Sequence, residues 1–219
     1  MSDDEQRTLD AWAVDRLGLG DKVLDRAAQR AADAGLPDIA VSSLQGHGLT
    51  VLAKIVGAKR ILEVGTLAGF STICLARALP PDGKLITLEI DPTHAEVACD
   101  NLQDAGVLDQ VEVHIGQAID TLAKLDPVTD GPIDLTFIDA DKENCVVYLE
   151  HALRLSRSGS VIVVDNAFRQ GRIIDGDTPD VIGMQQLFDA IAANPQLDAT
   201  ALQTAGAKGL DGFILARVR

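Results

Sequence analysis

The spacing of hydrophobic residues divides the chain into two parts. In residues 5–34, apolar side chains recur at helical spacing, which predicts two helices broken near Gly18–Gly20. Residues 44–56 have the spacing of a further amphipathic helix, with the polar, glycine-containing segment Gln45–Gly48 interpreted as a loop at its start. Residues 1–40 are therefore expected to form a helical prologue to the rest of the chain.

Beyond this prologue, short runs of apolar and β-branched residues alternate with segments of helix length. Such alternation predicts parallel strands joined by right-handed helical crossovers, in a sheet that helices cover on both faces. The expected fold class is therefore α/β, doubly wound and mostly parallel. The predicted strands are Arg60–Val64, Lys84–Ile90, Gln110–Ile115, Ile133–Ile138 and Ser160–Val164.

The C-terminal region has a different pattern. After a predicted helix at Pro179–Ala193, the strand-like runs Ala199–Gln203 and Phe213–Val218 are separated only by a glycine-rich turn. This turn is too short for a parallel crossover, so the two runs should pair antiparallel at one edge of the sheet. The sheet is then seven-stranded, and residues 1–219 are expected to form one domain with residues 41–219 as its core.

Composition and charge narrow the classes of protein to consider. A chain of 219 residues with 47% hydrophobic content can bury the core of one domain. The net charge of −14, with no run of Lys or Arg, would repel a phosphodiester backbone and makes nucleic acid a poor partner. No apolar run approaches the roughly 20 residues of a membrane helix. A small-molecule ligand is favoured, with no membrane partner.

The cysteines and the N-terminal residues bear on the compartment. Cys74, Cys99 and Cys145 are odd in number and widely spaced, which gives little support to a disulfide framework or a Cys-rich metal site. Residues 1–5 are acidic and lack the basic and apolar regions of a signal peptide. We therefore expect reduced thiols and a cytoplasmic location.

Oxygen-bearing side chains follow two of the predicted strands. Asp139 comes directly after Ile133–Ile138, and the pair Asp165 and Asn166 follows Ser160–Val164. The C-terminal ends of parallel strands share one rim of the sheet, so these side chains can converge on one divalent cation. Carboxylate and amide oxygens suit Mg²⁺, Ca²⁺ or Mn²⁺ rather than zinc. The alternative is a helix cap at Asp139 and a turn at the Asp–Asn pair.

A glycine-containing turn follows the first predicted strand. The segment Glu63–Ser71 reads EVGTLAGFS, and glycine at such a turn lets a ligand approach the backbone. Leu67 stands where a dinucleotide fingerprint needs its second glycine, and no phosphate-binding Gly-Lys-Ser/Thr loop occurs. Glu89 ends the second strand, where a carboxylate can accept hydrogen bonds from both ribose hydroxyls. An adenosine without a pyrophosphate fits this pattern.

Together these residues resemble the S-adenosylmethionine-dependent methyltransferases, whose first motif reads E/D-x-G-x-x-x-G and whose second strand ends in an acid. The segments Asp139–Lys142 and Asp165–Asn166 narrow the resemblance to the cation-dependent O-methyltransferases, which include catechol and caffeoyl-CoA O-methyltransferases. The similarity runs from about Val41 to the C-terminus. It implies a Rossmann-like class I methyltransferase fold, S-adenosylmethionine and a divalent cation, most simply Mg²⁺, as cofactors, a catechol-type acceptor, and a homodimer.

The resemblance also implies roles for individual positions. Asp139, Asp165 and Asn166 match the metal ligands, Lys142 matches the catalytic base, and Asp139 is expected to serve catalysis as well. His47, a solitary histidine in a polar segment, is interpreted as a surface residue. The residues similar to those that contact the cofactor are Val41, Glu63, Gly65, Ser71, Glu89, Ala118 and Asp139, with Glu63, Gly65 and Ser71 around the methionine part and Glu89 on the ribose.

Two departures from the family pattern concern the acceptor. Cys145 stands where bacterial relatives often carry an aromatic residue, and Ala167–Arg169 replaces their Val-Leu-Trp. Arg169 and Arg172 could pair with an acceptor carboxylate, or they could be exposed loop charges.

Two other readings stay open at this stage. One is a different transferase that uses the same cofactor, such as an aminopropyltransferase or an N-methyltransferase. The other is a non-catalytic module that binds S-adenosylmethionine. Neither requires the Asp–Asn pair or Lys142, whereas an O-methyltransferase of the resembled type needs both.

Overall fold

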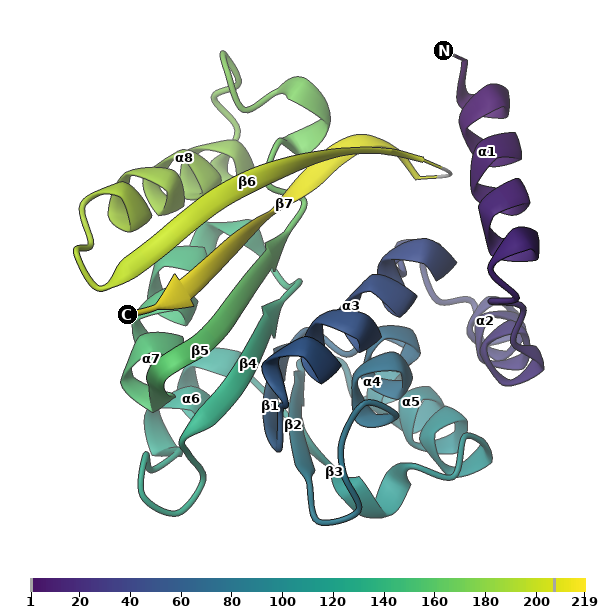
Figure 1. The fold of residues 1–219 in the computed structure, drawn as a ribbon, viewed down its shortest axis with the longest axis horizontal. Coiled ribbons are helices and arrows are strands. Elements are labelled where there is room, and N and C mark those ends of the chain that lie inside the picture. Colours follow the sequence, from purple (N-terminus) through teal and green to yellow (C-terminus); the bar gives the residue numbers. More distant parts are fainter. Residues whose placement is uncertain (1, 207) are drawn as a thin grey trace.

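The computed structural model describes residues 2–206 and 208–219, and within them the strands form one seven-stranded sheet in the order β3-β2-β1-β4-β5-β7-β6. The first five strands in this order run parallel, whereas β7 pairs antiparallel with both β5 and β6. The predicted fold class and the antiparallel C-terminal hairpin are thus confirmed (Figure 1). The strands are β1 (Arg60–Val64), β2 (Lys84–Glu89), β3 (Val111–Ile115), β4 (Ile133–Ile138), β5 (Ser156–Asp165), β6 (Leu197–Gly206) and β7 (Gly209–Val218).

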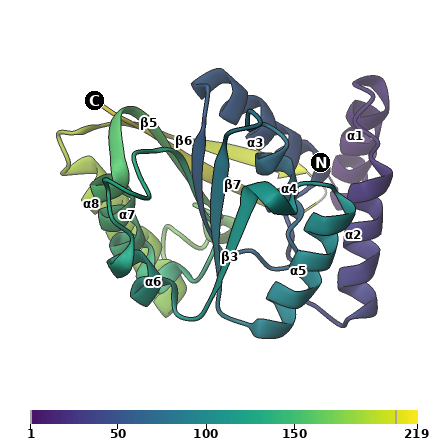
Figure 2. The same ribbon diagram turned by 90° about the horizontal axis from the view of Figure 1, so that it is seen from below.

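Helices cover both faces of this sheet (Figure 2). The α-helices are α1 (Asp3–Arg16), α2 (Lys22–Asp33), α3 (Ser43–Val56), α4 (Phe70–Ala76), α5 (Pro92–Asp104), α6 (Ala118–Lys124), α7 (Cys145–Leu155) and α8 (Pro179–Ala192). Three short 3₁₀ turns are η1 (Leu108–Gln110), η2 (Lys142–Asn144) and η3 (Arg169–Gly171). None of the helices in the described residues is long and apolar enough to cross a membrane.

Alternation along the central strands builds two separate cores. Successive side chains of a strand point to opposite faces of the sheet, so two adjacent apolar residues are buried on different faces. Leu62 of β1 packs with side chains of α6, α7 and α8, whereas its neighbour Ile61 packs with side chains of α2, α3, α4 and α5. This is why continuous apolar runs, and not alternating ones, mark the central strands.

Some boundaries differ from the sequence expectation. The hairpin strands β6 and β7 each extend toward the turn beyond the predicted runs, and β5 begins at Ser156 instead of Ser160. The added hairpin residues, such as Thr204 and Gly206, are small or polar, so no apolar alternation reveals their ladder of hydrogen bonds. Figure 1 shows the hairpin tip reaching toward α1.

The segment Gln45–Gly48 was wrongly interpreted as a loop, because it lies within α3. The side chain of Ser42 caps this helix by accepting the N–H of Gln45 at 3.2 Å. Gly46 is needed inside the helix because a Cβ there would lie 2.9 Å from the sulfur of Cys74 on α4. The glycines made this segment resemble a loop, whereas Gly46 allows the close contact between α3 and α4.

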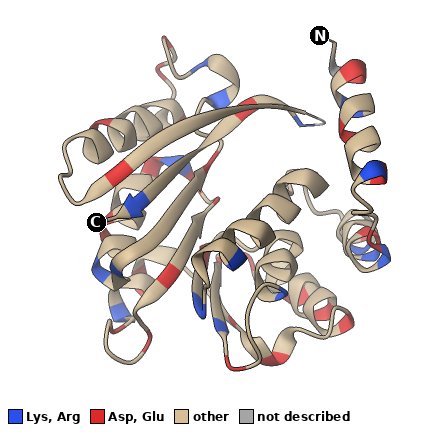
Figure 3. Cartoon of the chain, in the orientation of Figure 1, with Lys and Arg blue, Asp and Glu red and all other residues tan. Residues whose placement is uncertain are grey.

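Charged residues are distributed over the helices and strands. In Figure 3, Lys and Arg are interspersed with Asp and Glu along the chain. The parallel strands end at one common rim of the sheet, and the loops that follow them carry most of the predicted site residues.

Candidate functional site

A cavity of about 710 Å³ runs along the C-terminal rim of the parallel strands. Its lining follows the strand order, from Gly116 after β3, through Glu89 after β2 and Gly65 after β1, to Asp139 after β4 and Asn166 after β5. Of the predicted site residues, Val41, Gly65, Ser71, Glu89, Ala118, Asp139, Lys142 and Asn166 line this cavity. Glu63 and Asp165 are not among its lining residues, and both are buried beside it.

The turn after β1 depends on glycine at one position. Gly65 has a φ of 99°, and a Cβ there would lie 2.4 Å from the carbonyl oxygen of Asp139. The N–H of Asp139 in turn donates to the carbonyl of Val64 at 2.8 Å. The turn after β1, which we expected from the sequence to contact a cofactor, is thereby pressed against the start of the loop that carries Asp139.

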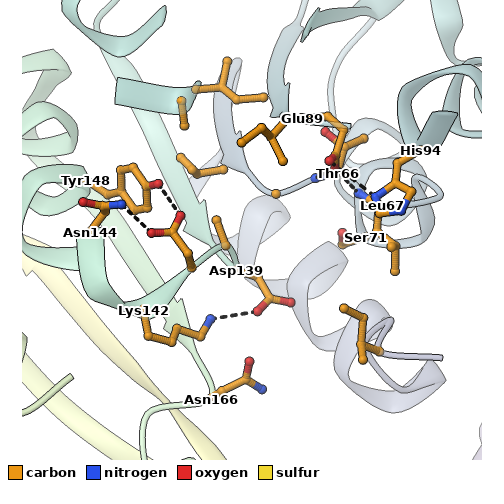
Figure 4. Close-up of a pocket in the computed structure, with 18 of the residues that line it drawn as sticks. Thr66, Leu67, Ser71, Glu89, His94, Asp139, Lys142, Asn144, Tyr148 and Asn166 are labelled. Atoms are coloured by element: carbon orange, nitrogen blue, oxygen red, sulfur yellow. Dashed lines mark hydrogen bonds and ion pairs between the residues drawn. The ribbon is translucent and has the colours of Figure 1, made fainter. Parts of the chain in front are cut away.

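Glu89 organises the same turn from the end of β2. Its Oε2 accepts the backbone N–H of Leu67 at 2.7 Å and that of Thr66 at 3.2 Å, and its Oε1 accepts the N–H of Asp91 at 3.0 Å. The ring of His94 lies beside it, with Nδ1 3.5 Å from Oε1. Figure 4 shows these groups gathered at one end of the cavity. The contact of Glu89 with a ribose stays a prediction. The hydrogen bonds that Glu89 accepts from the turn were not predicted from the sequence.

Glu63 lies beneath the turn, fully buried. Three hydroxyls donate to its carboxylate, from Ser71 at 2.6 Å, Thr72 at 2.5 Å and Thr87 at 2.7 Å. Burial raises the pKa of Glu63 to about 7, even though the three hydroxyl hydrogen bonds lower it. Because Ser71 also lines the cavity, Glu63 reaches the cofactor end through this serine.

The opposite part of the cavity carries the predicted catalytic pair. Lys142, in the turn η2, is only 5% exposed, and its Nζ lies 3.0 Å from Oδ1 of Asp139. Lys142 is therefore not a solvated surface residue. Figure 4 shows Asn166 on the same side of the cavity as this pair. Asn166 adopts a left-handed φ of 55°, which asparagine tolerates better than most residues.

Asp165 ends β5 and is buried behind this group. Its Oδ2 accepts from Nε2 of Gln45 at 2.7 Å, and its Oδ1 accepts the N–H of Asn166 at 2.8 Å. Burial, together with the negative charge of Asp139, raises the pKa of Asp165 to about 6. Gln45 was missed in the sequence because it lies on α3, far from any strand end.

The described residues contain no group of three or more His, Cys, Asp or Glu side chains gathered as a metal site. The predicted ligand set has two such residues, Asp139 and Asp165, and its third member is the amide Asn166. Metal binding therefore stays a proposal that depends on the chemistry of these oxygens.

A further group on the cavity wall was not predicted. The hydroxyl of Tyr148 on α7 donates to Oδ1 of Asp141 at 2.5 Å, and Nδ2 of Asn144 donates to Oδ2 at 2.5 Å. Burial and this carboxylate raise the pKa of Tyr148 above its ordinary value. The signal in the sequence was the position of Tyr148, two helical turns after Asp141.

Arg169 and Arg172, in the region where the sequence departs from the family pattern, are both ion-paired. Nε and Nη2 of Arg169 lie 2.9 and 2.7 Å from Oδ2 of Asp180, and Nη2 of Arg172 lies 3.0 Å from the same oxygen. The hydroxyl of Thr178 and these guanidinium groups hold the pKa of Asp180 well below its usual range. Arg169 and Asp180 also line the cavity, so the description of Arg169 as an exposed loop charge is wrong. Arg172 is exposed and does not line the cavity.

Comparisons with known proteins agree with this geometry. A family model described as O-methyltransferase matches residues 19–218. The chain is 52% identical over 208 residues to a catechol O-methyltransferase of Mycobacterium tuberculosis, covering 94% of this chain and 93% of the relative. An O-methyltransferase from Bacillus cereus, solved in complex with SAH, superimposes with a TM-score of 0.97 at 44% identity and covers 100% of both chains.

A second solved structure, the O-methyltransferase TomG from Streptomyces achromogenes in complex with SAM, superimposes with a TM-score of 0.96 at 43% identity. The alignment covers 100% of this chain and 99% of that one. Sequence and fold thus agree over nearly the whole length. The chain belongs to the O-methyltransferase family.

Proposed function

We propose that this O-methyltransferase transfers the methyl group of S-adenosylmethionine to a hydroxyl of a small catechol-type acceptor, with a divalent cation bound beside the acceptor. The observation that carries the proposal is one continuous cavity. It joins the glycine turn at Gly65 to the group of Asp139, Lys142 and Asn166. Relatives named catechol O-methyltransferase, and solved relatives that hold SAM or SAH, support it.

The end of the cavity at β1, β2 and β3 fits the cofactor. Gly65 leaves the backbone open to the methionine part, and Ser71 presents a hydroxyl whose proton is engaged by Glu63. Glu89 accepts three backbone N–H groups, and a carboxylate has about four lone-pair sites, so it can accept one ribose hydroxyl without losing these contacts. Val41 and Ala118 add apolar wall at this end.

The residues at the ends of β4 and β5 fit a hard divalent cation. Asp139 and Asp165 bring two negative charges to this place, where Lys142 supplies one positive charge, so the group as it stands has an excess of negative charge. Asn166 adds a neutral amide oxygen, and such a donor set suits Mg²⁺, Mn²⁺ or Ca²⁺. When bound, the cation would hold two adjacent hydroxyls of a catechol and lower their pKa.

Gln45 has a supporting role in this arrangement. One hydrogen bond reaches each oxygen of Asp165, from Nε2 of Gln45 and from the N–H of Asn166, and together they fix the plane of the carboxylate. Partners of this kind orient metal ligands and are needed for tight metal binding. Gln45 is therefore proposed to hold Asp165 in its ligating position.

Lys142 is proposed as the base. A catechol hydroxyl has a pKa of roughly 10, as in tyrosine, and must lose its proton to attack the methyl carbon. The neutral amine form of Lys142 would take this proton at Nζ. The sulfonium of the bound cofactor would supply the methyl group, so that a C–O bond replaces the C–S bond and S-adenosylhomocysteine is the second product. Asp139, 3.0 Å from Nζ, would hold the lysine at the acceptor.

The test is methyl transfer to catechol from S-adenosylmethionine labelled in its methyl group. Turnover is expected with Mg²⁺ or Mn²⁺, none after exhaustive chelation, and restoration when the metal is returned. A monophenol serves as the matched control and should react far more slowly, because it lacks the second hydroxyl. Full turnover in the metal-free protein would refute the metal assignment, and labelled amine products would favour an N-methyltransferase.

Absence of any product, with the cofactor still bound, would favour a non-catalytic module. In that case, isothermal titration would record binding of S-adenosylmethionine, while no acceptor would be consumed. The intact set of Asp139, Lys142, Asp165 and Asn166 argues against this alternative, since cofactor binding alone does not require it.

We also propose that the chain forms a homodimer in a reducing cytosol. An apolar groove lies between α3 and the β6–β7 hairpin, and Val51, Ile55 and Leu202 around it are exposed. Light scattering is expected to give twice the chain mass, and Ile55→Lys is expected to give a monomer. A wild-type monomer at micromolar concentration would refute the dimer. The three cysteines are free thiols, as the proposed compartment requires.

A further inference from the structure

The end of the cavity beyond Asn166 is formed by the turn η3 and the start of α8. Because the strand order places β5 after β4 along the rim, this end lies on the far side of Asp139 and Lys142 from the cofactor turn. Whatever part of an acceptor extends past its reacting hydroxyl must therefore meet Arg169 and Asp180, which line this end.

The charges at this end do not cancel. Arg169 and Arg172 both pair with the single carboxylate of Asp180, which leaves one positive charge in excess. Elsewhere the cavity is acidic, since Asp139, Asp141 and Glu143 also line it, and the chain carries a net charge of −14. Beyond Lys142, an anionic substituent on an acceptor would be repelled by these acids and attracted by the arginines.

The guanidinium of Arg169 is held in place with donors to spare. Asp180 engages its Nε and Nη2, and no hydrogen bond within the described residues uses its Nη1. The side chain is 21% exposed, so it is shielded from bulk solvent yet reaches the cavity. An arginine restrained on one edge and open on the other can bind a carboxylate with little further loss of side-chain freedom.

The backbone of this turn is strained. Asn166, Arg169 and Gln170 have φ values of 55°, 49° and 57°, in the left-handed region that residues with a Cβ seldom occupy. Such strain persists only where surrounding contacts enforce it, and it is concentrated at ligand-binding sites. Here Arg169, one of the strained residues, lies on the cavity wall and its side chain is bound by Asp180.

We propose that Arg169 is a specificity-determining residue that binds a carboxylate on the acceptor, with Asp180 positioning its guanidinium and Arg172 supplying the excess positive charge. The preferred acceptors are then catechols that bear a carboxylate. This inference rests on the proposed catechol methylation, because it concerns the part of the same acceptor that does not react.

The test compares two acceptors that differ in one charge, 3,4-dihydroxybenzoate and 3,4-dihydroxybenzamide. The wild-type protein is expected to have a kcat/KM about tenfold or more higher for the carboxylate, as a hydrogen bond between charged groups would give. This preference should decrease as the salt concentration rises, because the attraction is electrostatic. No substitution is needed for this part of the experiment.

The same ratio is then measured in three variants. Arg169→Gln should bring the ratio close to one, and Arg169→Lys should retain part of the preference. Arg7→Gln is the matched control, because Arg7 is 63% exposed on α1 and its loss changes the net charge equally. The control should keep the wild-type ratio.

The outcomes separate this inference from the function on which it rests. If neither acceptor is methylated, the proposed function fails and the inference fails with it. If both are methylated but the wild-type ratio is near one, only the inference is overturned. A preference that persists in Arg169→Gln, or that disappears equally in Arg7→Gln, would overturn it too.

Discussion

The two ends of the cavity are built in different ways. At the cofactor end, the turn after β1 is held by backbone groups, as when the N–H groups of Thr66 and Leu67 donate to Glu89. At the end where we propose that the acceptor binds, called the acceptor end below, side chains hold one another, as when Arg169 pairs with Asp180. The backbone N–H groups are present whatever side chains stand at these two positions, whereas a contact between side chains changes when either partner is replaced. Specificity for the acceptor can therefore vary while cofactor binding stays the same.

The largest effect is expected where the two ends meet, at Lys142. Replacement by methionine should lower kcat by about 10²- to 10⁴-fold, the usual contribution of a general base, because a methionine side chain cannot take the proton of the acceptor hydroxyl. Affinity for S-adenosylmethionine should change little, as measured by isothermal titration. Lys124→Met, at an exposed position of α6, is the control. Equal losses of turnover and cofactor affinity would mean that Lys142 supports the fold of the site and not the chemistry.

The next effect concerns Glu63 and depends on pH. Its pKa is raised from 4.5 to about 7 in the folded protein. As the pH rises, the unfolded chain loses the Glu63 proton at a lower pH than the folded protein does. The contribution of Glu63 to the free energy of unfolding is therefore complete below about pH 4.5 and is lost as the pH rises through about 7. Glu63→Gln does not titrate, so its stability relative to wild type should increase from pH 5 to pH 8, by up to about 3 kcal/mol.

Urea unfolding at the two pH values measures this difference. The exposed Glu96→Gln on α5 is the control and should show no comparable change between pH 5 and pH 8. A constant difference between Glu63→Gln and wild type at both values would mean that Glu63 is ionised in the folded protein throughout.

At the cofactor end, Glu89→Ala should weaken binding of S-adenosylmethionine by about 1.5–3 kcal/mol, the range for hydrogen bonds to a charged group. The substitution removes the acceptor of three backbone N–H groups as well as any contact with the ribose. Titration with a 2′-deoxyribose analogue of the cofactor separates these two contributions. If Glu89 contacts the ribose, the variant should no longer distinguish the analogue from the natural cofactor; a discrimination that stays intact would place the ribose elsewhere.

The smallest effect tests how α8 supports the acceptor end. A Cβ on Gly183 would lie 2.3 Å from the carbonyl oxygen of Lys142, whereas nothing lies within 4 Å of a Cβ on Gly48 in α3. Gly48→Ala should therefore stabilise the protein by up to about 1 kcal/mol through helix propensity. Gly183→Ala should gain the same propensity but lose about 1–3 kcal/mol to overpacking, for a net loss of up to about 2 kcal/mol.

Thermal unfolding gives the stabilities of both glycine variants, and their turnover should diverge as well. Only Gly183→Ala should lower kcat, because it displaces the backbone of Lys142. Similar turnover in the two variants would show that the close approach of α8 does not position the lysine.

The difference between the two ends also explains what the sequence could predict. Asp139, Asp165 and Asn166 could be located because each directly follows an apolar strand, and parallel strands bring such ends together. The glycine turn could be located because backbone geometry demands glycine at Gly65. These signals are local, so one sequence suffices to read them.

Contacts between distant segments had no such signal. Nothing in the local pattern places Asp180 against Arg169, Gln45 against Asp165, or Gly183 against Lys142. These contacts depend on how α3 and α8 pack on the sheet and on the rotamers of long side chains, which hydrophobic spacing does not encode. Glu63 shows the same limit, because the motif predicts its place in the chain but not its burial beneath Ser71.

The hydrogen bond between Gln45 and Asp165 spans 120 positions of the chain. Closing a loop of this length has an entropic cost that is not recovered until strands from both halves of the sheet have paired, and contacts of high sequence separation slow folding. The glycine turn requires only β1, β2 and the end of β4. During refolding, affinity for S-adenosylmethionine should therefore be recovered before methyl transfer, with an interval set by docking of β5 against α3.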